Sequence, residues 1–331
     1  MTAQTALDPA NLPTDIPTVA PRRQRALRLP RSRKTLVGIA LLALFVLLAL
    51  FGPLLAPLDP TLTSGDLLQG PSAAHLLGTT QSGQDVLSEL LVGARSTVLI
   101  GFLAGIIASL LSVLIGVTAG YLGGLADDLL SLLTNVFLVV PGLPLLIVLA
   151  AYLPKSTGAN PFVLALIISL TGWAWGARVL RAQTMSIRGR DYVAAARVAG
   201  ERPSRIILAE ILPNLTAIVA SSFVFTVLYA IGTYVALAFL GVVDPAQWSW
   251  GGMLFWAESL NAPQVGAWWW FLPPGLAIAL LGTSLALLNF GLDEFINPRL
   301  RAAGLSRKAA KAAGVPRRVR FGLTPVRGGQ R

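Results

Sequence analysis

Few residues in this chain could perform chemistry, and they are not arranged to do so together. The 331 residues include no cysteine and a single histidine, His75, which excludes disulfides and thiolate metal sites. Nucleophilic catalysis needs a nucleophile with a base beside it, and the sequence shows no convergent cluster of Asp, His, Ser or Cys. A lone histidine in a surface loop is usually structural, so we expect no catalytic site, no metal and no cofactor.

Nucleotide chemistry is also missing from this chain. Phosphate-binding loops have the pattern G-x-x-x-x-G-K-[ST], and none of the four lysines follows a glycine. If the protein takes part in transport against a gradient, the energy must therefore come from another chain. That chain is expected to act on a rigid segment on the cytoplasmic side.

One charged segment, DYVAAARVAGERPSRIILAEILPN (residues 191–214), lies between two apolar runs. Its alanines favour a helix, Gly200 suits a left-handed turn, and Ser204 can begin a second helix. We therefore predict a short helix, a glycine turn and a second helix. Alanines let another backbone approach closely, so the segment suits docking into a groove of a partner. An interfacial helix that lies on lipid is the alternative.

The elements around this segment are apolar enough for a bilayer. Hydrophobic residues make up 54% of the chain and charged residues 12%, whereas soluble domains carry about 25% charged residues. A membrane-spanning helix needs roughly 20 apolar residues, and the chain has six apolar runs: 35–57, 94–120, 129–153, 161–177, 215–243 and 266–291. The sequence predicts an all-α integral membrane protein with six transmembrane helices, and a short cytoplasmic helix between the fourth and the fifth.

The basic residues indicate how these helices are oriented. With the N-terminus placed inside, 24 of the 26 Lys and Arg fall in three cytoplasmic segments: 1–34, 178–212 and 292–331. Only Arg95 and Lys155 fall on the other side, which is a strong positive-inside signal. Both termini are therefore predicted to be cytoplasmic. The cations face the inner leaflet rather than nucleic acid, and we expect Arg188 and Arg190 to be solvated.

Tryptophans and prolines mark particular levels of the spans. Six tryptophans cluster around the outer ends of the last two runs: Trp248, Trp250, Trp256, Trp268, Trp269 and Trp270. They are predicted to anchor the protein at the membrane interface rather than to stack on a ligand. Pro141 and Pro144 interrupt the third run and predict a bend, either in a packing helix or in one that lines a substrate path.

Residues 191–214 resemble the "EAA" loop of permease subunits of ABC-type importers. That pattern is Glu-Ala-Ala, three residues, glycine, and Leu-Pro at a set distance. Here it reads Ala194-Ala195-Ala196, Gly200 and Leu212-Pro213, with Ala194 in place of the usual glutamate. Four other segments resemble the dipeptide, oligopeptide and nickel branch of these importers: 76–101, 120–146, 249–254 and 291–301. The first of them has Gly83-Gln84-Asp85 where the branch has Gly-Arg-Asp.

This resemblance implies a permease subunit of an ATP-driven, binding-protein-dependent importer in the cell inner membrane, with peptides as its expected cargo. The implied partners are a second permease, two cytoplasmic ATPase subunits, an extracytoplasmic substrate-binding protein and membrane lipid. The residues implied to couple to the ATPase are Tyr192, Ala195, Ala196, Gly200, Glu201 and Pro213.

The expected organisation has four parts. Residues 1–34 form a disordered basic cytoplasmic N-terminus, 35–93 an anchor helix with a periplasmic loop, 94–291 the permease domain, and 292–331 a basic cytoplasmic tail. An ion-coupled secondary transporter is an alternative, but it predicts inverted repeats and polar groups at the midplane, which are not visible. A membrane scaffold is the other alternative.

Overall fold

The computed structural model describes residues 33–152, 160–244 and 246–296. The prediction for Lys155 lies outside these residues, as does almost all of the predicted N-terminal segment and of the C-terminal tail. The described elements are helices: α1 Arg33–Leu55, α2 Val86–Leu122, α3 Gly124–Val139, α4 Gly142–Ala151, α6 Pro161–Arg188, α7 Asp191–Val198, α8 Pro203–Arg205, η2 Ile206–Ile211, α9 Leu212–Phe239, α10 Trp250–Ser259 and α11 Trp268–Ile296.

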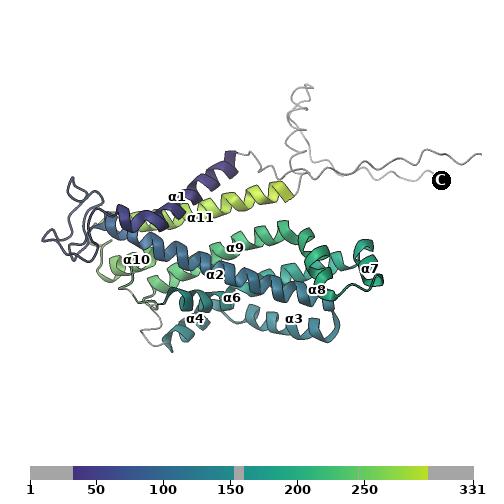
Figure 1. Cartoon of the computed structure of the whole chain (residues 1–331). Helices are drawn as coiled ribbons and strands as arrows, with labels where there is room; N and C mark the ends of the chain where they lie inside the picture. Colours follow the sequence, from purple (N-terminus) through teal and green to yellow (C-terminus); the bar gives the residue numbers. More distant parts are fainter. Residues whose placement is uncertain (1–32, 153–159, 245, 297–331) are drawn as a thin grey trace, which may run out of the picture.

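The predicted all-α membrane architecture is confirmed. Five described helical runs are long and apolar enough to cross a membrane. Helices α3 and α4, which meet at an angle of 86°, form a sixth crossing if the pair counts as one broken span. The loop 56–85 and α10 lie at one end of the bundle, and α7 and α8 lie at the opposite end (Figure 1). We refer to these as the α10 end and the α7 end.

Side-chain caps set where several helices begin. Asp85 accepts a hydrogen bond from Ser88 N and starts α2, Asn160 accepts from Phe162 N before α6, and Ser249 accepts from Gly252 N before α10. Such caps satisfy amide groups that have no partner within the helix.

Helices α2 and α6 extend well beyond their apolar runs. Helix α2 starts at Val86 rather than near Ala94, and α6 continues to Arg188 rather than ending at Ala177. Ionisable side chains therefore lie on the helix ends. Among them, Asp127 of α3 accepts two hydrogen bonds from Arg181 of α6, at 2.5 and 2.7 Å, and joins these helices near the α7 end.

Helices α2 and α6 form the most extensive helix pair of the bundle. A methyl group at Gly120 would lie 2.6 Å from the carbonyl oxygen of Arg181, so the two backbones touch there. The hydroxyl of Ser112 donates to the carbonyl of Trp173 at 2.6 Å. Small residues and interhelical hydrogen bonds of this kind hold membrane helices together where lipid is as apolar as the side chains.

The tryptophan cluster corrects one prediction. Trp250 and Trp270 are only 1% and 2% exposed, inside the core, so they are not interface anchors. Trp269 is part-buried and its indole donates to the carbonyl of Thr79 at 3.2 Å, which attaches the loop 56–85 to α11. Trp256 and Trp268 are exposed and remain compatible with the interface.

Candidate functional site

The charged segment 191–214 folds as the predicted helix, glycine turn and second helix. Helix α7 covers Asp191–Val198, and Gly200 has a φ of +77°. The second helix begins at Pro203 rather than at Ser204, because proline suits the first helical position, where its missing N–H is not needed. It continues through the wider π turn η2, which ends two residues before Pro213, into α9.

The glycine turn closes α7 with two hydrogen bonds. Gly200 N donates to the carbonyl of Arg197 at 3.0 Å, and Glu201 N donates to that of Ala196 at 3.1 Å. This is the Schellman pattern of a helix end. A methyl group at Gly200 would meet nothing within 4 Å, so only the left-handed backbone requires glycine here.

One face of α7 anchors it to the bundle. Val193 is completely buried in a cluster that includes Tyr121, Leu180 and Ile206, and Ala196 packs against the same cluster. The guanidinium of Arg197 lies 5.0 Å from the centre of the Tyr121 ring. Ala196, expected at a partner contact, therefore faces inward and holds α7 in place.

The opposite face of α7 is open. Ala195 is exposed, the side chain of Tyr192 is 42% exposed, and Val198 is 90% exposed. These three residues, spaced three apart, form a small apolar surface that we call the α7 outer face. The sequence reasoning missed Val198, although its spacing of five from Val193 already places the two valines on different sides of a helix.

The remaining predicted coupling residues lie beside this face or beyond it. Glu201 forms an ion pair with Arg205 one turn later. Pro213 is exposed in the first turn of α9, after the π turn, and is not part of α7 or its glycine turn.

Arg188 corrects another prediction. Its Nη1 donates to the carbonyl of Gly120 at 3.0 Å, at the C-terminus of α2. A cation at this position satisfies carbonyls without helical partners and complements the helix dipole. Arg188 is therefore an internal cap of α2, whereas Arg190 is exposed, as expected.

The break between α3 and α4 lies at Val140–Pro141, where the prolines predicted a bend. A cavity of about 200 Å³ lies against this break, lined among others by Gly142, Trp175 and Tyr229. Thr171 and Tyr229 share a hydrogen bond of 3.2 Å beside it. The bend thus opens a partly polar hollow between α6 and α9.

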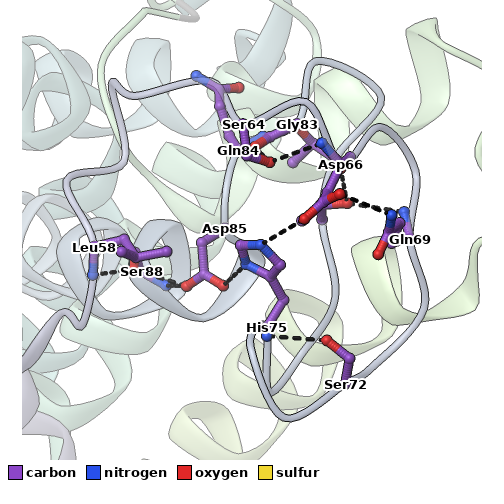
Figure 2. A network of polar contacts seen from close by, with 12 residues as sticks. Leu58, Ser64, Asp66, Gln69, Ser72, His75, Gly83, Gln84, Asp85 and Ser88 are labelled. Carbon is purple, nitrogen blue, oxygen red and sulfur yellow. Dashed lines mark hydrogen bonds and ion pairs between the residues drawn. The ribbon is translucent and has the colours of Figure 1, made fainter.

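At the α10 end, a polar network organises the loop 56–85 (Figure 2). His75 Nδ1 lies 3.0 Å from Asp85 Oδ1, and its Nε2 lies 3.8 Å from Asp66. The second oxygen of Asp85 accepts from the amide and the hydroxyl of Ser88. His75 was expected at the surface, but it is only 6% exposed. Its contacts are those of a structural residue that clamps the loop.

Two family descriptions match the chain. Residues 112–302 match the binding-protein-dependent transport system inner membrane component. Residues 21–71 match the N-terminal TM domain of oligopeptide transport permease C.

Similar proteins come from several bacteria. The di/tripeptide transport system permease protein DppC of Pseudomonas aeruginosa (strain UCBPP-PA14) is 34% identical over 82% of this chain and 90% of its own length. The oligopeptide transport system permease protein OppC of Bacillus subtilis (strain 168) is 31% identical, over 83% of this chain and 88% of its own. The dipeptide transport system permease protein DppC of the same organism is 32% identical, over 83% and 84%.

Proposed function

Because the chain belongs to the family of binding-protein-dependent transport system inner membrane components, we propose that it is one of two permease subunits of an ATP-driven peptide importer. Family membership makes it a multi-pass transport protein and not an enzyme. The peptide cargo is supported by the names of the dipeptide and oligopeptide permeases that it resembles over more than four fifths of its length.

The proposed orientation places the α7 end in the cytoplasm. Six of the seven Lys and Arg of residues 178–212 lie in the C-terminal third of α6 or in the loop that follows it, at this end, and basic residues concentrate on the cytoplasmic side of membrane proteins. Loop 56–85 and α10 then face outward, where a substrate-binding protein would deliver its cargo. Residues 35–93 are the proposed anchor and loop unit, 94–291 the permease domain, and the N-terminal segment and the tail are cytoplasmic.

The α7 outer face is the proposed contact with a cytoplasmic ATPase. This is the observation that carries the coupling proposal, because Tyr192, Ala195 and Val198 expose apolar surface next to the basic residues of the loop. Val193 ties α7 to α2, α6 and η2 through the buried cluster. Displacement of α7 by a closing ATPase would therefore move the helices of the bundle as bodies.

The cavity at the broken span is the proposed contribution of this chain to the translocation path. It lies between spans rather than at a helix end, and its lining combines aromatic side chains with the hydroxyls of Thr171 and Tyr229. Irregular backbone at membrane depth is tolerated where it lines a cavity. A second permease would supply the other half of the path.

The coupling proposal is tested by adding a charge to the α7 outer face. Val198→Asp and Ala195→Asp place a carboxylate at a contact that excludes water, where an unpaired charge is strongly unfavourable. We expect at least tenfold weaker capture of the ATPase by the reconstituted permease pair. ATP hydrolysis stimulated by loaded binding protein and peptide uptake should fall together.

The matched control is Ser186→Asp, which adds the same charge at an exposed position in the last turn of α6, at the same end. It should retain capture and uptake. Ala196→Asp is unsuitable, because Ala196 packs inward. Wild-type capture and uptake by Val198→Asp and Ala195→Asp would leave α7 as an interfacial helix without a coupling role.

A further inference from the structure

Two buried carboxyl groups lie one helical turn apart at the start of α2, and only one of them has partners. Asp85 is held by His75 and Ser88 (Figure 2). Glu89 is only 4% exposed, yet within the described part of the chain no hydrogen bond or ion pair reaches its carboxyl group. A buried carboxylate without a partner is strongly unfavourable, so Glu89 is ionised only when a group from outside the chain supplies the positive charge.

Glu89 borders a cavity that could hold such a partner. The cavity has a volume of about 640 Å³ and lies between the loop 56–85, α10 and the first turn of α11. Trp248, Trp256 and Trp270 contribute aromatic surface to its lining. The volume is within the range of small-molecule sites, which combine apolar walls with a few polar groups.

The lining selects the charge and the kind of ligand. A cation would stabilise the ionised form of Glu89, and tryptophan faces attract organic cations through their π systems. A calcium ion would need six to eight oxygen ligands, and the described residues contain no group of three or more His, Cys, Asp or Glu side chains that could hold a metal. An ammonium group attached to an organic body fits the site better than a metal ion.

We propose that this cavity binds the protonated N-terminal amino group of a peptide, with Glu89 as its counter-charge. The buried indole nitrogen of Trp270 also has no hydrogen-bond partner in the described structure. It could donate to the first peptide carbonyl, which lies next to the ammonium group in every unblocked peptide. The cavity would then receive peptides at the outer side before they enter the path, a role that rests on the proposed function.

Two probes that differ only in the amino group test this recognition. Trialanine amide carries the N-terminal ammonium group, and N-acetyl-trialanine amide does not. Each is titrated into the full-length chain in lipid nanodiscs, with tryptophan fluorescence and calorimetry as readouts. We expect trialanine amide to bind at least tenfold more tightly, and Glu89→Gln to remove this difference.

Glu258→Gln is the matched control, because it removes a carboxylate from the exposed side of α10 at the same end. It should leave both affinities unchanged. Trp256→Leu keeps the carboxyl group of Glu89 and changes an exposed residue of the cavity lining. This variant tests the site if Glu89→Gln fails to fold. It should weaken binding of the ammonium probe severalfold, without a matching loss for the acetylated probe.

Several outcomes would overturn the proposal. These are equal affinity for the two probes, an unchanged preference in Glu89→Gln, or no binding of either probe. If neither probe binds but Glu89→Gln weakens docking of the binding protein, the ammonium group belongs to a lysine of that protein and not to the substrate.

Uptake measurements separate this inference from the proposed function. The comparison is uptake of trialanine amide by the reconstituted complex with the wild-type chain and with Glu89→Gln. If the wild-type chain and Glu89→Gln take up and bind the peptide equally, the cavity proposal is wrong, while the proposal of peptide import is unaffected. If the complex binds the ammonium probe but imports no peptide, the import proposal is wrong and the proposed binding site is retained.

Discussion

The two loops at opposite ends of the bundle are built in opposite ways. Loop 56–85 turns its polar groups inward, where Asp85 bonds both His75 and Ser88. The loop around α7 turns apolar surface outward and is anchored mainly by Val193 and Ala196. A cross-bonded loop is suited to keep one shape, whereas a short helix on a small apolar anchor is suited to be pushed by a partner.

The largest effect is expected from Asp85→Ala, which removes the cap of α2 and the partner of His75 together. Loss of a helix cap and of partners for buried donors costs about 2 to 4 kcal/mol in total. We expect a lower melting temperature and faster proteolytic cleavage in residues 56–85, with α7 unchanged. Asp66→Ala is the control, because Asp66 is half exposed and contacts His75 only at 3.8 Å. Equal protease resistance in the two variants would show that the clamp does not hold the loop.

A smaller effect is expected from Gly200→Val. The side chain meets no atom, so the change acts through the left-handed backbone, which costs roughly 1 to 2 kcal/mol for a residue with a Cβ. Gly266 has a φ of +74° and equally open space, but lies between α10 and α11. Gly266→Val therefore imposes the same strain at the other end.

The readouts for this pair are melting temperature and ATPase coupling. Both variants should melt slightly earlier, and only Gly200→Val should uncouple ATP hydrolysis from uptake. If both uncouple equally, the strain acts through general stability and the α7 turn has no special role.

The smallest effect is expected from Arg188→Gln, which removes the side chain that caps the C-terminus of α2. Loss of one hydrogen bond of this kind costs about 1 kcal/mol, measured as a shift in thermal unfolding. Arg190→Gln, at an exposed position, should change stability by less than about 0.5 kcal/mol. Indistinguishable unfolding of the two variants would contradict the assigned cap.

Local chemistry made part of this structure predictable. Gly200 was expected to be left-handed because it follows an alanine-rich stretch that favours helix and precedes a second helix, and it has positive φ. The bend of the third span follows from Pro141, which cannot donate a backbone hydrogen bond. The angle of 86° between α3 and α4 depends on how each half packs against α6 and α9, so no local rule supplies it.

The side-chain environments were less predictable, because they depend on residues distant in the sequence. Arg188 and Arg190 look alike in sequence, and only the approach of α6 to α2 makes Arg188 a cap for Gly120. Ala195 and Ala196 are adjacent alanines, and the position of the buried cluster decides which of them faces a partner. Trp250 and Trp270 were mistaken for interface anchors because the spacing of tryptophans in the sequence does not show which of them are buried inside the protein.

The sequence by itself determined the membrane environment, the sites of the apolar runs, the charge asymmetry and the helix–glycine–helix loop. These properties depend on composition and on neighbouring residues, which act in any fold. Tertiary structure decided which side chains are buried, which carboxyl groups have partners and where cavities remain. Asp85 and Glu89 lie one turn apart on the same helix, but only folding of the loop 56–85 brings His75 to Asp85 and leaves Glu89 facing an open cavity.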